Sequence, residues 1–210
     1  MATEQDEGKL KGKKRKDERL KQIARTAVSL FYKNGYLQTS TRQIAEACGI
    51  SQSNLYYYIK SKEDFLDLFV QMTTASFDES TDDVRRQLEA TSPSEALKKV
   101  VRNNLVIIDA LQDMILFWYQ ESKTMGKTHF SKLMDQEIYI VKVYKMIIEE
   151  GVRRGEFTTG DPMLAGYNIL LLCDMWALKR WYMRKRYTLE EYIEHCQETA
   201  LNIAGARSCQ

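Results

Sequence analysis

Apolar residues recur along much of the chain at intervals of three and four, which is the period of an α-helix. A first helix is expected to begin near Asp17, whose carboxylate suits a helix N-terminus, and to end at Asn34 and Gly35. Its apolar positions are Leu20, Ile23, Ala24, Ala27, Val28, Leu30 and Phe31. No segment alternates convincingly as a strand, so the pattern predicts an all-α fold of about nine helices.

Two short helices are expected next. Hydroxyls over residues 39–41 can cap a helix that covers 41–48, and Ser51 can cap another helix over 52–59. Gly49 lies in the turn between them. Two helices joined by a short turn that contains glycine are typical of a helix-turn-helix, which places its second helix in the major groove of DNA.

The remaining chain is predicted to form six longer helices. The strongest start signals are Ser92-Pro93-Ser94-Glu95 and Asp161-Pro162, because proline is favoured in the first turn of a helix. The expected helices cover about 62–88 (with Ser61 as its cap), 93–108, 110–124, 128–152, 162–185 and 189–204.

The third helix has two different faces. Leu55 and Ile59 can pack back on the preceding helices. The opposite face would present Gln52, Ser53, Asn54, Tyr57 and Tyr58. Asparagine and glutamine side chains can pair with adenine, and aromatic rings can contact the thymine methyl group, so this face is expected to read bases.

The formal net charge of +2 hides a strong asymmetry. From Lys9 to Lys62 there are 13 lysines and arginines against three acidic residues, so the rest of the chain is net acidic. The third helix has no basic residue before Lys60, so attraction to phosphates must come from Arg42, Lys60, Lys62 and the N-terminal segment. Residues 1–16 are expected to be a disordered basic arm that is either simply solvated or in contact with DNA.

Four spaced motifs follow one another between residues 20 and 66. They are Phe31-Tyr32-Lys33-Asn34-Gly35-Tyr36, Thr39-Ser40-Thr41-Arg42-Gln43-Ile44-Ala45, Gly49-Ile50-Ser51 and Leu55-Tyr56-Tyr57-Tyr58-Ile59-Lys60-Ser61-Lys62-Glu63. In this order they resemble the DNA-binding head of TetR-type repressors, although Ser53 and Ile59 stand where glycine and phenylalanine are frequent. The resemblance implies a homodimer made by the last two helices and a ligand pocket in the body. It also implies DNA contacts from Thr41, Arg42, Gln52, Ser53, Asn54, Tyr56, Tyr58 and Lys62.

The body of the chain carries a second resemblance. Residues 117–123, 176–182 and 187–192 are similar to segments of TetR-type regulators of fatty-acid, sterol and aromatic-acid degradation, several of which respond to acyl-CoA thioesters. This resemblance implies a hydrophobic or acyl-CoA-like small-molecule effector. The domain division is then a DNA-binding domain over 17–62 and an effector-binding and dimerisation domain over 63–210.

Polar residues interrupt several apolar stretches of the body, at Asn103, Asn104, Asn168 and Asp174. An unpaired polar group there would cost about 1–3 kcal/mol, so these residues either pair within the protein or meet a ligand. Asp174 shares a helical face with Tyr167, Leu171, Leu178 and Trp181. The tryptophans belong either to the core or to a pocket. The candidate effector-binding residues are Trp118, Tyr144, Asn168, Asp174 and Trp181.

A basic cluster of Arg180, Arg184, Lys185 and Arg186 lies at the end of the helix over 162–185. Cations are favourable at a helix C-terminus, and they could alternatively bind CoA phosphates.

The last two helices are apolar on more than one face, so each needs more than one partner, and a homodimer through a four-helix interface is expected. The apolar residues concerned are Leu164, Ile169, Leu170, Leu172, Trp176, Tyr192, Ile193, Leu201 and Ile203.

Other classes of protein fit the sequence less well. His129 and His195 are the only histidines, and there is neither a glycine-rich phosphate loop nor a nucleophile beside a base, so no catalytic residue, metal site or cofactor is expected. The cysteines at 48, 173, 196 and 209 have no metal or redox spacing and are expected to be buried thiols. With no signal segment and no long apolar stretch, a cytoplasmic location without membrane contact is expected. An architectural DNA-binding protein without a ligand remains an alternative.

Overall fold

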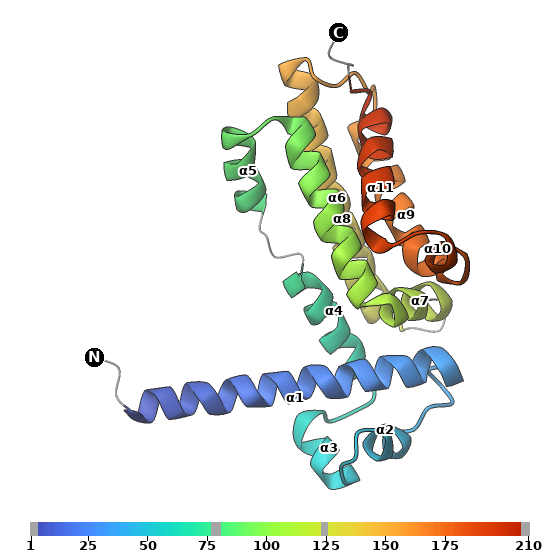
Figure 1. Cartoon of the computed structure of the whole chain (residues 1–210). Helices are drawn as coiled ribbons and strands as arrows, with labels where there is room; N and C mark the ends of the chain where they lie inside the picture. The colour runs from blue at the N-terminus through green and yellow to red at the C-terminus, as the bar shows by residue number, and fades with distance from the viewer. Residues whose placement is uncertain (1–3, 77–80, 123–125, 207–210) are drawn as a thin grey trace.

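The computed structural model describes residues 4–76, 81–122 and 126–206, and every regular element in these ranges is a helix. Helix α1 (Glu4–Asn34) runs across the base of the molecule, with α2 (Thr41–Ala47) and α3 (Gln52–Tyr58) below it (Figure 1). The other helices form the upper body. They are α4 (Asp64–Ser76), α5 (Thr81–Ala90), α6 (Pro93–Ala110), α7 (Gln112–Glu121), α8 (Lys127–Arg154), α9 (Pro162–Leu178), α10 (Arg180–Arg186) and α11 (Leu189–Ala204). The all-α prediction is confirmed, with eleven helices in the described ranges instead of about nine.

Local capping explains the ends of the short helices. Ser40 forms a capping box with Gln43 at the start of α2, and the Ser51 hydroxyl accepts the Asn54 N–H at the start of α3. Gly49 has a φ of +65°, which glycine adopts without a steric penalty, and it closes the turn between the two helices. The helix-turn-helix predicted from the sequence is therefore present.

The first helix begins at Glu4 and not near Asp17, so the disordered arm expected over residues 1–16 is wrong from residue 4 onward. Lys, Arg, Glu and Gln make up most of this extension, and all four are good helix formers. The packed part of α1, from Ile23 to Phe31, supplies the costly helix nucleus, so each further turn needs only propagation. Residues 1–3 lie outside the described part of the chain.

One predicted helix is split in two within the described residues. The helix expected over 162–185 is broken at Lys179 between α9 and α10. The helix expected over 62–88 corresponds to α4 and α5, and residues 77–80 between them lie outside the described residues. Helix α4 packs Phe65 and Phe69 into the core around α1, whereas α5 packs Val84 and Leu88 into the core of the body. Ser61 also does not cap α4, which begins at Asp64.

The two hydrophobic cores do not follow the expected boundary at residue 62. The lower core joins α1, α2, α3 and α4, and it also includes Met114, Phe117 and Trp118 of α7. The upper core lies between α5, α6, α8, α9 and α11. Helix α7 therefore connects the body directly to the DNA-binding part.

The turn after α8 depends on a close approach between Gly151 and the buried ring of Phe157. A Cβ atom at position 151 would overlap this ring. We expect Gly151→Ala to lower the free energy of unfolding by about 1–3 kcal/mol, because the ring must leave its site. Gly160→Ala is the matched control, since nothing lies within 4 Å of the added Cβ there, and it should change stability by less than about 0.5 kcal/mol. Urea unfolding measures both; equal effects of the two substitutions would contradict this packing argument.

Candidate DNA-binding surface and effector cavity

The outer face of α3 is open. Gln52, Ser53, Asn54, Tyr56 and Tyr57 are exposed and Tyr58 is half-buried. Leu55 and Ile59 are buried against α1 and α2, as the helical period predicted. The candidate reading residues therefore share one accessible surface.

Hydrogen bonds order part of this surface. The Thr41 hydroxyl of α2 lies 3.2 Å from the Tyr56 hydroxyl and accepts a hydrogen bond from the Gln52 amide at 3.3 Å. Arg42 forms an exposed ion pair with Glu46 at 2.9 Å, which a phosphate could replace at little cost. The structure thus brings Thr41, Gln52 and Tyr56 together across the two helices.

Lys62 is engaged inside the protein. Its ammonium group donates to the backbone carbonyls of Tyr36, Thr39 and Leu37 at 2.7, 3.2 and 3.4 Å, and it lies 4.3 Å from the centre of the Tyr36 ring. An ammonium group has three N–H donors, and these three carbonyls use all of them. In this structure Lys62 stabilises the loop between α1 and α2, so the phosphate contact implied by the resemblance would require these bonds to rearrange.

The N-terminal half of α1 lies beside the reading helix. The Lys16 ammonium is 4.5 Å from the centre of the Tyr57 ring, and Arg15 and Lys16 are exposed. The basic segment that precedes them continues the same helix (Figure 1). Lys16 thereby places a positive charge next to α3, which has none of its own.

An aromatic cluster connects this region to the body. The Phe31 ring of α1 lies 5.6 Å from the Phe117 ring of α7 and within 6.2 Å of the rings of Phe65 and Phe69 of α4. The Trp118 ring is 6.4 Å from that of Phe69. Any shift of α7 must therefore act on α1 and α4.

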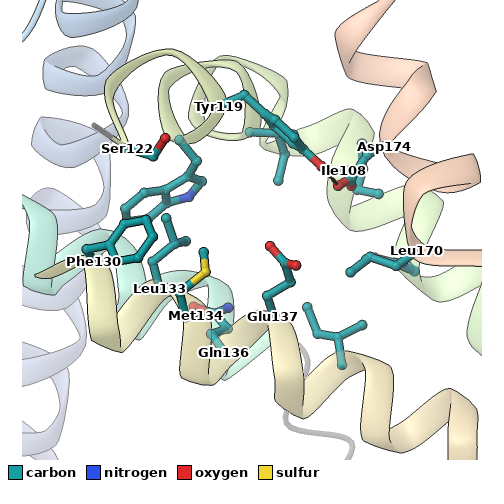
Figure 2. A pocket seen from close by; sticks show the side chains of 14 residues that line it. Ile108, Tyr119, Ser122, Phe130, Leu133, Met134, Gln136, Glu137, Leu170 and Asp174 are labelled. Atoms are coloured by element: carbon teal, nitrogen blue, oxygen red, sulfur yellow. Dashed lines mark hydrogen bonds between the residues drawn. The ribbon is translucent and has the colours of Figure 1, made fainter. Parts of the chain in front are cut away.

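A cavity of about 200 Å³ lies on the other side of α7. It is enclosed by α6, α7, α8 and α9, and most of its wall is apolar (Figure 2). The lining residues are Asn104, Ile108, Ile115, Trp118, Tyr119, Ser122, Phe130, Leu133, Met134, Gln136, Glu137, Ile140, Leu170 and Asp174. Apolar walls with a few polar groups are typical of small-molecule sites.

Two acidic side chains face this cavity. Asp174 is 7% exposed and accepts a hydrogen bond from the Tyr119 hydroxyl at 2.8 Å. Burial, with a smaller contribution from the negative charge of Glu137, raises the pKa of Asp174 from 3.8 to about 7, although the Tyr119 hydrogen bond acts in the opposite direction. Burial also raises the pKa of Glu137.

The five candidate effector residues occupy different environments. Trp118 and Asp174 line the cavity. Tyr144 is completely buried behind it, with its hydroxyl accepting the Asn104 amide N–H at 2.9 Å. Asn168 is exposed and Trp181 is 68% exposed, so the predicted placement of these two residues in the pocket is wrong. The packing of α9 turns Asn168 outward, and Trp181 lies on α10, beyond the break at Lys179.

Sequence reasoning missed Glu137 and Tyr119 as lining residues. Glu137 follows Leu133 by four residues and precedes Ile140 by three, so it shares their helical face. A carboxylate on an otherwise apolar face was the available signal.

The basic cluster is not at the cavity. Arg180 forms an ion pair with Asp113 at 2.8 Å and lies over the Tyr32 ring of α1, and Arg184 forms an ion pair with Asp109 at 2.9 Å. Asp109 also accepts the Trp176 indole N–H at 2.7 Å. These contacts hold α10 against the junction of α6 and α7. They disfavour binding of CoA phosphates by Arg180 and Arg184, because both side chains already pair with aspartates.

No cluster of potential metal ligands occurs among the residues that the structure describes. Cys173 and Cys196 are buried and Cys48 is half-buried, all as free thiols, whereas Cys209 lies outside the described residues. Across the described helices, none has the length and apolar character needed to cross a membrane.

The buried carboxyl of Asp174 predicts a pH-dependent stability. Because its pKa is raised to about 7, the folded protein binds more protons there than the unfolded chain between about pH 4 and 7. Its contribution to stability therefore falls as the pH rises through this window and is constant above it. We expect the wild type to lose up to a few kcal/mol between pH 5 and 8 relative to Asp174→Asn, which keeps an acceptor for Tyr119. Urea unfolding at fixed protein concentration tests this, and parallel pH profiles of the two proteins would contradict it.

Comparison with known proteins agrees with this architecture. The family described as bacterial regulatory proteins, tetR family, matches residues 23–68, and the tetracyclin repressor-like C-terminal domain matches residues 90–204. The HTH-type transcriptional regulator HbdR of Aromatoleum sp. (strain CIB) is 28% identical over 179 residues, which is 85% of this chain and 77% of HbdR.

Two solved structures show the same fold. AibR in complex with isovaleryl coenzyme A and operator DNA matches with a TM-score of 0.71 and 20% identity, over 90% of this chain and 100% of AibR. FadR of Bacillus subtilis in complex with stearoyl-CoA matches with a TM-score of 0.66 and 22% identity, over 89% of this chain and 98% of FadR. Since the C-terminal family description alone covers more than half of the sequence, the chain belongs to the TetR family of bacterial transcriptional regulators.

Proposed function

We propose that this regulator is a cytoplasmic repressor that binds a near-palindromic operator as a homodimer and leaves it when a small hydrophobic effector enters the cavity. The observation that carries this proposal is the position of α7. Its Trp118 lines the cavity and also belongs to the core that positions α1 and α4. A ligand in the cavity therefore touches the element that connects the body to the reading head.

DNA binding divides between two groups of residues. Gln52, Ser53, Asn54, Tyr57 and Tyr58 supply the base-reading face of α3, because their side chains are short polar or aromatic groups on one surface. Thr41 and Arg42 at the start of α2, together with Tyr56, supply phosphate contacts. The basic extension of α1 adds attraction to the phosphates, which strengthens binding to any sequence.

The dimer is proposed to form through the outer face of α9. Leu164, Leu171 and Met175 are exposed and share one stripe with Asn168. Of the residues expected at this interface, Ile169, Leu170, Trp176, Tyr192 and Ile193 are instead buried inside the protomer. The half-exposed Leu201 offers a contribution from α11. A two-fold dimer through α9 presents two copies of α3, as a palindromic operator requires.

The effector class follows from the lining and from the relatives. The apolar side chains of the wall, which include Ile108 and Leu170, suit an acyl chain or an aromatic ring. AibR and FadR were each solved with an acyl-CoA, and their fold is the one found here. We propose that the acyl group of such a thioester occupies the cavity and that its phosphates lie outside it.

Release from DNA requires that the effector bind one body conformation better than the other. A tenfold loss of operator affinity needs only about 1.4 kcal/mol of differential binding. Movement of α7 is the proposed link, since Phe117 and Trp118 pack on α1 and α4.

The assigned reading helix can be tested by substitution. We expect Asn54→Ala to lower the preference for operator over random DNA by roughly tenfold, because a base contact is worth about 1–3 kcal/mol. Arg42→Ala should instead weaken binding to both DNAs alike and reduce the salt dependence by about one phosphate contact. The operator would first be selected from genomic fragments. If Asn54→Ala leaves the preference intact, α3 is not the reading helix.

The dimer face can be tested independently of DNA. Leu171→Glu places a charge at the centre of the exposed α9 stripe, so we expect a monomer at micromolar concentration and operator affinity reduced by at least about tenfold. Val152→Glu is the control, because Val152 is similarly exposed but lies near the end of α8. Sedimentation measures the assembly; a wild-type monomer, or a dimeric Leu171→Glu protein, would refute this interface.

A further inference from the structure

The cavity has an unusual charge composition for a site proposed to take an acid derivative. Its polar lining includes two carboxyl groups, Glu137 and Asp174, and none of its described lining residues is a lysine, an arginine or a histidine. The Arg180 and Arg184 side chains, the nearest candidates from the sequence, are paired with Asp113 and Asp109 away from this cavity. Nothing in the described wall would neutralise an anionic ligand.

Hydrogen-bond acceptors face the cavity without full partners. Figure 2 shows the Glu137 carboxyl directed into the open space towards Tyr119 and Asp174. No hydrogen bond or ion pair of Glu137 occurs within the described ranges. Asp174 has one oxygen bonded to the Tyr119 hydroxyl.

Asn104 adds a buried acceptor that has no partner. It is 1% exposed, its amide N–H bonds to Tyr144, and its carbonyl oxygen has no hydrogen-bond partner among the described atoms. Turning the amide over would leave the N–H₂ end unpaired instead, so one end lacks a partner in either orientation. Buried polar groups are normally paired, and a ligand in the cavity that Asn104 lines can supply the missing partner.

We infer that the effector presents to Glu137, Asp174 and Asn104 a hydrogen-bond donor that carries no negative charge, and that the cavity rejects a free carboxylate. This inference rests on the proposed function, because it assigns the polar group of the proposed effector. A carboxylate would lose its hydration and meet like charges, whereas an amide N–H or an ammonium group would gain acceptors. An acyl thioester of CoA satisfies the requirement, since its pantetheine part carries uncharged amides, and the corresponding free acid does not.

The test uses three probes with the same alkyl chain: octanoate, octanamide and octylammonium. Each is titrated calorimetrically into the full-length protein at pH 7.5. We expect octanamide and octylammonium to bind at least tenfold more tightly than octanoate. Equal or tighter binding of octanoate, or no binding of any probe, overturns the inference.

A charge-removing variant localises the effect. Glu137→Gln should raise octanoate affinity and lower octylammonium affinity, changing their ratio at least tenfold, while octanamide affinity changes little. Glu149→Gln is the matched control, because Glu149 lies on the same helix but is exposed and pairs with Lys145. An unchanged ratio in Glu137→Gln also overturns the inference. Operator binding without any probe is measured on the same samples, so failure of the proposed function and failure of this inference remain distinguishable.

Discussion

Contact between the Phe31 and Phe117 rings, 5.6 Å apart, is the interaction on which the arrangement of the two parts of the molecule depends. Phe31 is fully buried and also meets Tyr36, Phe65 and Phe69, so one side chain of α1 joins the loop before α2, helix α4 and helix α7. Aromatic rings pack at defined angles and bury large areas, so this cluster has few alternative arrangements. The position of the reading helix relative to the body is consequently set from inside the protein rather than by surface contacts.

Charged side chains of different sign occur in different regions of the molecule. Lys16 of α1 lies over the Tyr57 ring of α3, while the cavity contains carboxyl groups without a described cation. Arg180 and Arg184, which the sequence left open as phosphate ligands, instead pair with Asp113 and Asp109 beside α1. Cations at the junction between the two parts stabilise their contact, and the same cations in the cavity would have changed the ligand that it accepts.

The sequence predicted the features that depend on local signals. Capping serines, Gly49 and the period of Leu55 and Ile59 were sufficient for the helix-turn-helix and its exposed face. The break at Lys179 has no local signal such as glycine or proline, and Arg180 beside it pairs with Asp113, 67 residues earlier in the chain, which the sequence could not show. Helix α9 is apolar on nearly all sides, so its period could not show that Asn168 faces outward while Asp174 faces inward. The cavity forms only where four helices pack together. The position of Glu137 in its wall could therefore not be assigned without the tertiary structure.

The absence of lysine and arginine from Gln52 to Tyr58 has a consequence for how such a regulator can change over generations. Other elements provide the attraction to phosphates. Substitutions at Ser53, Asn54 or Tyr57 can therefore alter the preferred bases while the sequence-independent affinity for DNA is retained. A variant with altered base preference would still bind chromosomal DNA through its phosphate contacts and could encounter new sites. Duplicated copies of the gene could therefore acquire separate sets of target promoters through a few changes in one seven-residue helix.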